Sequence, residues 1–176
     1  AGKYGYDAIW ARDSMISFLG ASLINNHLYK KSFKQSLIIL ATNQSKNGQI
    51  PNAVDKFSRR KKHVDFASID STLWYVIGHY LYKKRYKDGS LFKKYKKTIK
   101  QSLLWLNYQD IGEKGMLAQL PTTDWQDAFP HKYGYTINTQ ALYYKVLNLI
   151  GMVKDAEKLK CPVAQCSPVA FLRISW

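Results

Sequence analysis

Residues 70–81 carry a clear helical pattern: Asp-Ser-Thr-Leu-Trp-Tyr-Val-Ile-Gly-His-Tyr-Leu. Large apolar side chains recur three or four residues apart, at Leu73, Ile77 and Leu81, with Trp74 beside the first of them. Asp70 falls on the same face, one turn earlier. The segment therefore predicts a helix that opens within residues 65–70 and turns a carboxylate toward its buried side.

The same spacing recurs in four other segments, so we expect at least five helices. The other four cover roughly residues 13–29, 32–43, 90–106 and 136–150. Asp13 or Ser14 is the expected N-cap of the first helix. No stretch alternates apolar and polar residues as a strand does, so we expect an all-α chain without a sheet of more than two short strands.

The length of 176 residues suits one domain with its own core, and 46% of the residues are hydrophobic. The tail from residue 161 to 176 lacks the Lys and Tyr that are abundant before it. We therefore expect a domain over residues 1–160 and an atypical tail over 161–176, for which we favour an out-of-frame or artefactual origin. No apolar run is long enough to span a bilayer, and we expect a cytoplasmic protein. Because the sequence begins with Ala1 inside a motif, we expect a fragment.

The net charge of +15 raises the possibility of nucleic-acid binding. In the basic segment 93–100, however, five lysines interleave with Tyr95 and Ile99, which is the pattern of an amphipathic helix with a solvated outer face. Few of the basic residues are arginines, the type preferred for phosphate and base recognition. We expect no nucleic-acid partner, no cofactor and no metal; Cys161 and Cys166 have no nearby ligand partners.

A loop between two expected helices concentrates acidic and aromatic side chains: Pro121-Thr-Thr-Asp-Trp-Gln-Asp-Ala-Phe-Pro-His131. Prolines at both ends favour a shaped loop rather than a helix. A carboxylate beside a large apolar ring loses hydration, which suits a general acid. Asp124 as a helix cap beside a half-buried Trp125 is an equally good interpretation of this segment alone.

Three other segments also mix apolar walls with carboxylates, amides or arginine: Trp10-Ala-Arg-Asp13, Gln49-Ile-Pro-Asn52 and Ser68–Trp74. Sugars require this mixture, since pyranose rings stack on apolar faces and their hydroxyls bind bidentate polar groups. Arg12 and Asp13 can pair with each other, which would keep Asp13 ionised as an acceptor for hydroxyls. The alternative for these two residues is an N-cap with a surface ion pair.

Taken in order, these segments resemble a known family. Tyr6-Asp-Ala-Ile-Trp-Ala-Arg-Asp-Ser-Met15 is similar to a segment of glucoamylases and related α/α-barrel glycosidases. The later segments, up to Asp124-Trp-Gln-Asp-Ala128 and the helix that includes residues 137–144, follow the order of the amylo-α-1,6-glucosidase domain of glycogen debranching enzymes. The resemblance covers roughly residues 4–150.

The resemblance implies about half of an (α/α)6 barrel of six helical hairpins, and inverting hydrolysis of an α-glucosidic bond in an α-glucan or oligosaccharide. It makes Asp127 the general acid, with Asp124 as the alternative because the family commonly has Thr at that position. The residues it implies for substrate binding are Trp10, Arg12, Asp13, Asn52, Asp70 and Trp125. The catalytic base of the family is expected beyond the fifth helix, and no carboxylate follows Asp155 and Glu157, so we expect this chain alone to hold half a site.

Two alternatives stay open. One is another hydrolase of the same barrel, such as a neutral invertase or a trehalase-like enzyme. The other is a non-catalytic helical module that binds glycan or acidic partners.

Overall fold

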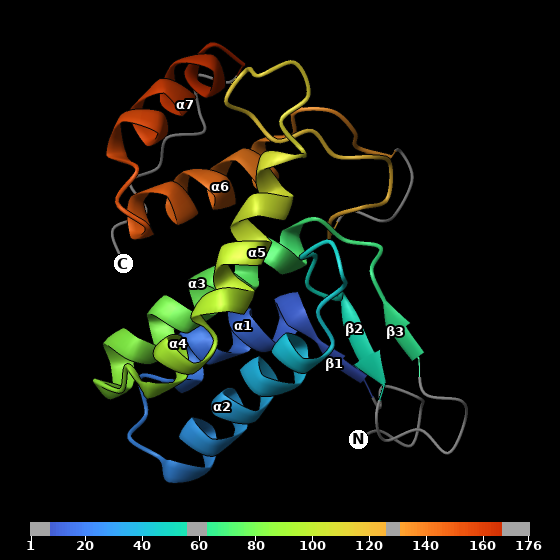
Figure 1. Cartoon of the computed structure of the whole chain (residues 1–176). Helices are drawn as coiled ribbons and strands as arrows, with labels where there is room; N and C mark the ends of the chain where they lie inside the picture. Colours follow the sequence, from blue (N-terminus) through green and yellow to red (C-terminus); the bar gives the residue numbers. More distant parts are fainter. Residues whose placement is uncertain (1–7, 56–62, 126–130, 167–176) are drawn as a thin grey trace.

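A computed structural model describes residues 8–55, 63–125 and 131–166 of the chain. Within these ranges the chain forms seven helices and three short strands (Figure 1). The elements are, in order, β1 (Ala8–Trp10), α1 (Ala11–Ala21), α2 (His27–Thr42), β2 (Ala53–Asp55), β3 (His63–Asp65), α3 (Asp70–Tyr86), α4 (Ser90–Lys94), α5 (Lys96–Asn107), α6 (Ile137–Leu149) and α7 (Val153–Cys166). The expectation of at least five helices is confirmed.

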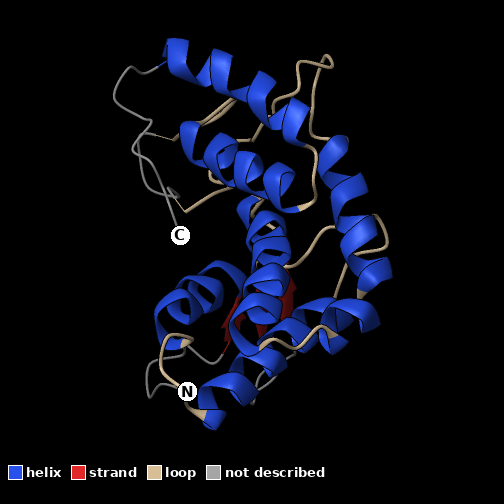
Figure 2. Cartoon of the chain, turned by 90° about the vertical axis from the view of Figure 1, so that its left-hand side faces the viewer, coloured by secondary structure: helices blue, strands red, loops and turns tan. Residues whose placement is uncertain are grey.

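Helix α3 is the centre of the described structure, because it packs against α1, α2, α4, α5 and α6. Its sequence shows why: Leu73, Val76 and Tyr82 are almost completely buried, as are residues on other sides of the helix. A helix that is buried nearly all round must be covered by several neighbours. Helices α1 and α2 cover one part of it, and α6, which pairs with α7, covers another (Figures 1 and 2).

The three strands correct the expectation that no sheet would exceed two strands. They form an antiparallel sheet in the order β1-β2-β3, with Ile9 opposite Val54 and Val54 opposite Val64. Each strand has three residues, which is too short for an alternating pattern to be recognised in the sequence. Figure 2 shows the strands confined to one small region of a largely helical molecule.

Three predicted helix boundaries are wrong: the start and the end of the first helix and the start of the second. The N-cap of α1 is Trp10, not Asp13 or Ser14, and the backbone N–H of Ala11 donates to the carbonyl of Asn52 at 2.8 Å. The backbone carbonyl of a distant loop thus accepts a hydrogen bond at the start of α1, where a capping side chain would otherwise be expected. Helix α1 ends at Ala21 instead of near Tyr29, and α2 begins at His27, because the Asn26 side chain accepts from Leu28 N–H and caps the second helix.

The expected helix over residues 90–106 is divided, because Tyr95 leaves helical geometry between α4 and α5. The expected helix over residues 136–150 is confirmed as α6, with Thr136 and Ile150 as its caps. Helix α7 was not predicted; it continues past residue 160 to Cys166, and the proposed domain boundary at 160 remains a prediction.

The lysines of segment 93–100 are exposed, while Ile99 beside them is buried. The predicted amphipathic pattern of this helix is therefore present, and its charges face solvent. None of the helices in the described ranges combines the length and apolar character needed to cross a membrane.

Gly48, in the turn that follows α2, packs very closely against α5. A Cβ atom at this position would lie 2.3 Å from the carbonyl oxygen of Gln101, and the φ angle of Gly48 is +99°. Gly48→Ala therefore combines left-handed strain with a clash against backbone, and we expect it to lower the free energy of unfolding by about 2–4 kcal/mol.

The matched control is Gly115→Ala. Gly115 also has a positive φ, +71°, but nothing lies within 4 Å of its added Cβ. Urea denaturation should show a loss of about 1–2 kcal/mol for this control, from left-handed strain alone. Equal losses for the two variants would contradict the close packing of Gly48 on α5.

His79 is a buried titratable group in the middle of α3. Its side chain is 1% exposed, its ring lies edge-on to Tyr75 with centroids 4.7 Å apart, and neither ring nitrogen has a hydrogen-bond partner among the described residues. Burial lowers the pKa of His79 to about 3, because the charged imidazolium would lose its hydration. The folded protein therefore holds His79 neutral.

This depressed pKa predicts acid destabilisation. Between about pH 6.5, the ordinary pKa, and pH 3 the unfolded chain binds a proton at His79 that the folded chain does not, so the free energy of unfolding falls as pH falls. Against a His79→Leu variant, the wild-type unfolding constant should rise by up to roughly tenfold per pH unit in this window and stay level above pH 7. Stability curves of the two proteins that run parallel from pH 7 to pH 4 would contradict this.

Candidate active site

The end of the small sheet brings three separate segments together. Trp10 pairs with Ala53, and Ala53 pairs with Asp65. The residues that follow Trp10, precede Ala53 and follow Asp65 therefore lie side by side at the same end of the sheet. This register places the Trp10–Asp13 segment, the Gln49–Asn52 segment and the segment before α3 at one edge. Strand pairing therefore brings these motifs together, which sequence analysis did not foresee.

Asn52 connects all three segments. Its carbonyl accepts from Ala11, its backbone N–H donates to the carbonyl of Asp65 at 2.7 Å, and its side-chain amide donates to the Asp65 carboxylate at 2.8 Å. Its side-chain oxygen accepts from the Ser71 hydroxyl at 3.3 Å in α3. Asn52 is 9% exposed, so these contacts use most of its hydrogen-bonding capacity and hold the site together.

Arg12 pairs with Asp70 and not with its sequence neighbour Asp13. The guanidinium Nη1 lies 2.8 Å from the Asp70 carboxylate, which also accepts from the Ser68 hydroxyl. This corrects the expected Arg12–Asp13 pair, since adjacent residues of a helix point in different directions. Asp13 instead lies exposed in the first turn of α1.

The Asp70 carboxylate is fully buried, and the Arg12 side chain is 16% exposed. A buried carboxylate is stable only when it is paired and hydrogen-bonded, and both partners are supplied here. Asp70 also lies in the first turn of α3, where the helix dipole favours a negative charge. The pair joins the amino end of α1 to the amino end of α3.

The loop predicted to carry the general acid reaches the same place. The Thr123 carbonyl accepts from the backbone N–H of Ile69, the residue before Asp70, at 2.8 Å. The next residue, Asp124, is 3% exposed, whereas the Trp125 side chain is 54% exposed. Asp127 lies outside the described residues, so its assignment as the general acid remains a prediction.

The segment just before this loop is anchored to α6. The Gln140 side chain bonds both the N–H and the carbonyl of Leu117, at 3.1 and 2.7 Å, and the Gln119 side chain accepts from Thr136 at 2.6 Å. The amino ends of α1 and α3 are therefore tied to segments that were predicted to carry chemistry, and the amino end of α6 is tied to the residues just before the loop.

Asp65, Ser68 and Ser71 are residues that sequence analysis did not single out for the site. They bind the side chains of Asn52 and Asp70. Their position in the sequence could have indicated this role, because Asp65 and Ser68 come just before α3, whose first residue, Asp70, is a buried carboxylate. Among the described residues, no group of three or more His, Cys, Asp or Glu is placed to hold a metal ion.

Comparison with known proteins gives one result for the first two thirds of the chain. A protein-family model described as amylo-alpha-1,6-glucosidase matches residues 1–116, which include Trp10, Arg12, Asn52 and Asp70 but end before Asp124. A search of curated proteins found no match. Because the family model covers more than half of the sequence, the chain belongs to the amylo-alpha-1,6-glucosidase family.

Proposed function

We propose that the protein is a glucosidase that hydrolyses α-1,6-glucosidic branch bonds of an α-glucan with inversion, within a six-hairpin barrel. The observation that carries the proposal is the cluster at the amino ends of α1 and α3. There the family match coincides with a buried Arg12–Asp70 pair next to the exposed Asp13. The membership favours this activity over an invertase, a trehalase-like enzyme or a non-catalytic module.

Arg12 and Asp13 are the proposed groups that grip the terminal glucose. Asp13 is an exposed carboxylate, which can accept hydrogen bonds from two sugar hydroxyls. Arg12 is held by Asp70, so its remaining N–H groups are fixed in direction before substrate arrives. Trp10 and Trp125 are the proposed apolar walls, and Trp125 is exposed enough to stack on a sugar ring.

Asp127 is the proposed general acid, which protonates the leaving glycosidic oxygen while a second carboxylate activates water on the opposite face of the sugar. Asp124, three residues earlier, is the alternative. Its burial beside the start of α3 supports a structural role, in which it fixes the loop so that Trp125 and Asp127 can reach the substrate.

The test is release of glucose from a branched limit dextrin by the full-length protein. Asp127→Asn should lower kcat by roughly 10²–10⁴-fold with little change in KM, because the amide keeps the shape but cannot deliver a proton. The same variant should retain most of its rate on α-glucosyl fluoride, since fluoride departs with little protonation. Asp13→Asn should instead impair binding and turnover together.

Asp124→Asn is the matched comparison. If Asp124 only supports the loop, its variant should show similar losses on both substrates. A different outcome would assign the acid role to Asp124. In that outcome Asp124→Asn loses dextrin hydrolysis but keeps hydrolysis of the fluoride, and Asp127→Asn has near-normal activity.

The role of Asp70 as a positioning residue gives a separate prediction. Asp70→Asn leaves the partly buried Arg12 guanidinium without its counter-charge, so the free energy of unfolding should fall by about 3 kcal/mol. KM for dextrin should rise more than kcat falls, because Arg12 is proposed to bind substrate.

The control is Asp155→Asn, which removes the exposed partner of Lys158 at 3.6 Å. Urea denaturation should show a change below about 0.5 kcal/mol for this surface pair. A comparably small effect of Asp70→Asn on both stability and KM would contradict the positioning role.

A further inference from the structure

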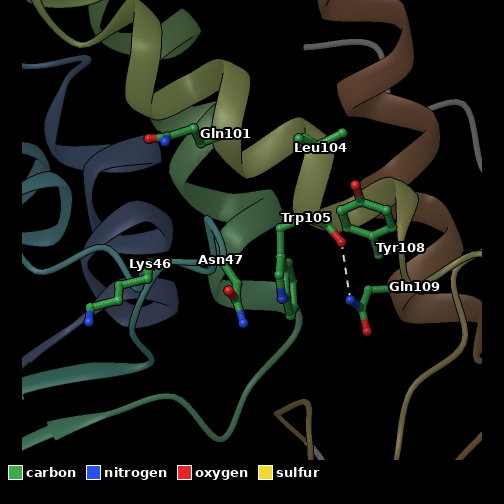
Figure 3. A pocket seen from close by; sticks show the side chains of 7 residues that line it. All are labelled: Lys46, Asn47, Gln101, Leu104, Trp105, Tyr108 and Gln109. Carbon is green, nitrogen blue, oxygen red and sulfur yellow. Dashed lines mark hydrogen bonds between the residues drawn. The ribbon is translucent and has the colours of Figure 1, made fainter.

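A second concave surface lies on the outside of α5, apart from the candidate active site. It is a groove of about 420 Å³ between the turn that follows α2 and the carboxyl-terminal half of α5. Figure 3 shows Lys46 and Asn47 projecting from the turn, and the other lining side chains coming from α5 and its end. These are Gln101, Leu104, Trp105, Tyr108 and Gln109.

The wall formed by the turn is held rigidly against α5. The Gln44 amide nitrogen lies within hydrogen-bonding distance of the Gly48 carbonyl at 2.8 Å, the Thr98 carbonyl at 3.0 Å and the Ser102 hydroxyl at 3.0 Å. Gly48 approaches Gln101 so closely that no Cβ would fit between them. The separation of the two walls is therefore set by these partly buried hydrogen bonds and by the close approach of Gly48 to Gln101.

The chemistry of the lining matches a carbohydrate. Two aromatic side chains, Trp105 and Tyr108, offer faces for pyranose rings, and Tyr108 is 72% exposed. Primary amides from Asn47, Gln101 and Gln109 can each donate to and accept from hydroxyls. The Gln109 amide is fixed beside the indole by a hydrogen bond to the Trp105 carbonyl at 3.1 Å (Figure 3).

The charges in the groove argue against other ligands. Its lining contains one cation, Lys46, and no carboxylate. A single-stranded nucleic acid would also stack on the aromatic rings, but binding of its phosphates requires a track of several cations. An apolar protein segment would find only Leu104 as an aliphatic side chain. A neutral, hydroxyl-rich chain is the ligand that uses all of these groups.

We propose that this groove is a second binding site that holds an α-glucan chain while the active site works on another part of the same polymer. The inference rests on the proposed function, which supplies a branched glucan as substrate. A polymer bound at two sites gains affinity without new contacts at either one, because the second binding event becomes intramolecular. The groove should therefore strengthen binding of glycogen far more than binding of a single sugar.

The experiment compares Tyr108→Ala and Trp105→Ala with wild type in the full-length protein, using affinity electrophoresis in glycogen gels and kinetics on two substrates. The matched control is Tyr29→Ala, an exposed tyrosine near the opposite end of α2. Both groove variants should raise the Kd for glycogen roughly tenfold and raise KM for limit dextrin. Their kcat/KM for α-glucosyl fluoride, which is too small to reach the groove, should match wild type.

Unchanged glycogen binding in Tyr108→Ala would overturn the proposal, and this variant is the decisive one because the side chain is exposed and its removal leaves the core intact. Equal weakening by Tyr29→Ala would overturn it as well. If wild type binds poly(U) more tightly than glycogen, and the groove variants lose this binding, the groove is a nucleic-acid site instead. If wild type binds glycogen through the groove but releases no glucose, the proposed activity fails while the binding site stands.

Discussion

A buried ion pair, Arg12–Asp70, is the constraint on which the described structure depends. The Asp70 carboxylate has no exposed surface, and a charge in that position is tolerated only with a counter-charge and hydrogen bonds in place. Arg12 lies 58 residues earlier in the chain. Its partnership with Asp70 fixes the start of α1 beside the start of α3, the central helix that α1 helps to cover.

The small sheet follows from this constraint. Once α1 and α3 begin side by side, the strand before α1 and the strands before α3 lie within hydrogen-bonding reach, and their backbone groups pair. Asn52 then satisfies the first amide of α1 and the backbone of Asp65, so neither needs a local capping side chain. The sheet is thus a means of satisfying backbone groups where helices meet, and it adds little core of its own.

The sequence predicts those features that depend on local periodicity. Helix α6 was placed to within a residue because thirteen residues of regular spacing define it. The site was predicted as a set of motifs, but the pairing within it was not, since Arg12 has an acidic neighbour at Asp13 and its partner is Asp70. The same reason explains the cap of α1: the acceptor of the Ala11 N–H belongs to Asn52, which no pattern near α1 could reveal. Strands of three residues leave no pattern at all.

The segment Gly48–Asn52 gives the two proposed sugar sites a fixed relation. Gly48 packs closely against α5 at the groove, and Asn52 is hydrogen-bonded to Asp65 and Ser71 at the candidate active site. Four residue steps span at most about 15 Å, even when fully extended. A glucan chain seated between Asn47 and Trp105 would therefore be held near the Arg12–Asp70 cluster by rigid contacts, with no linker to dilute its effective concentration. The same close packing that is expected to make Gly48→Ala destabilising is what would let the outer groove raise the local concentration of branches at the candidate active site.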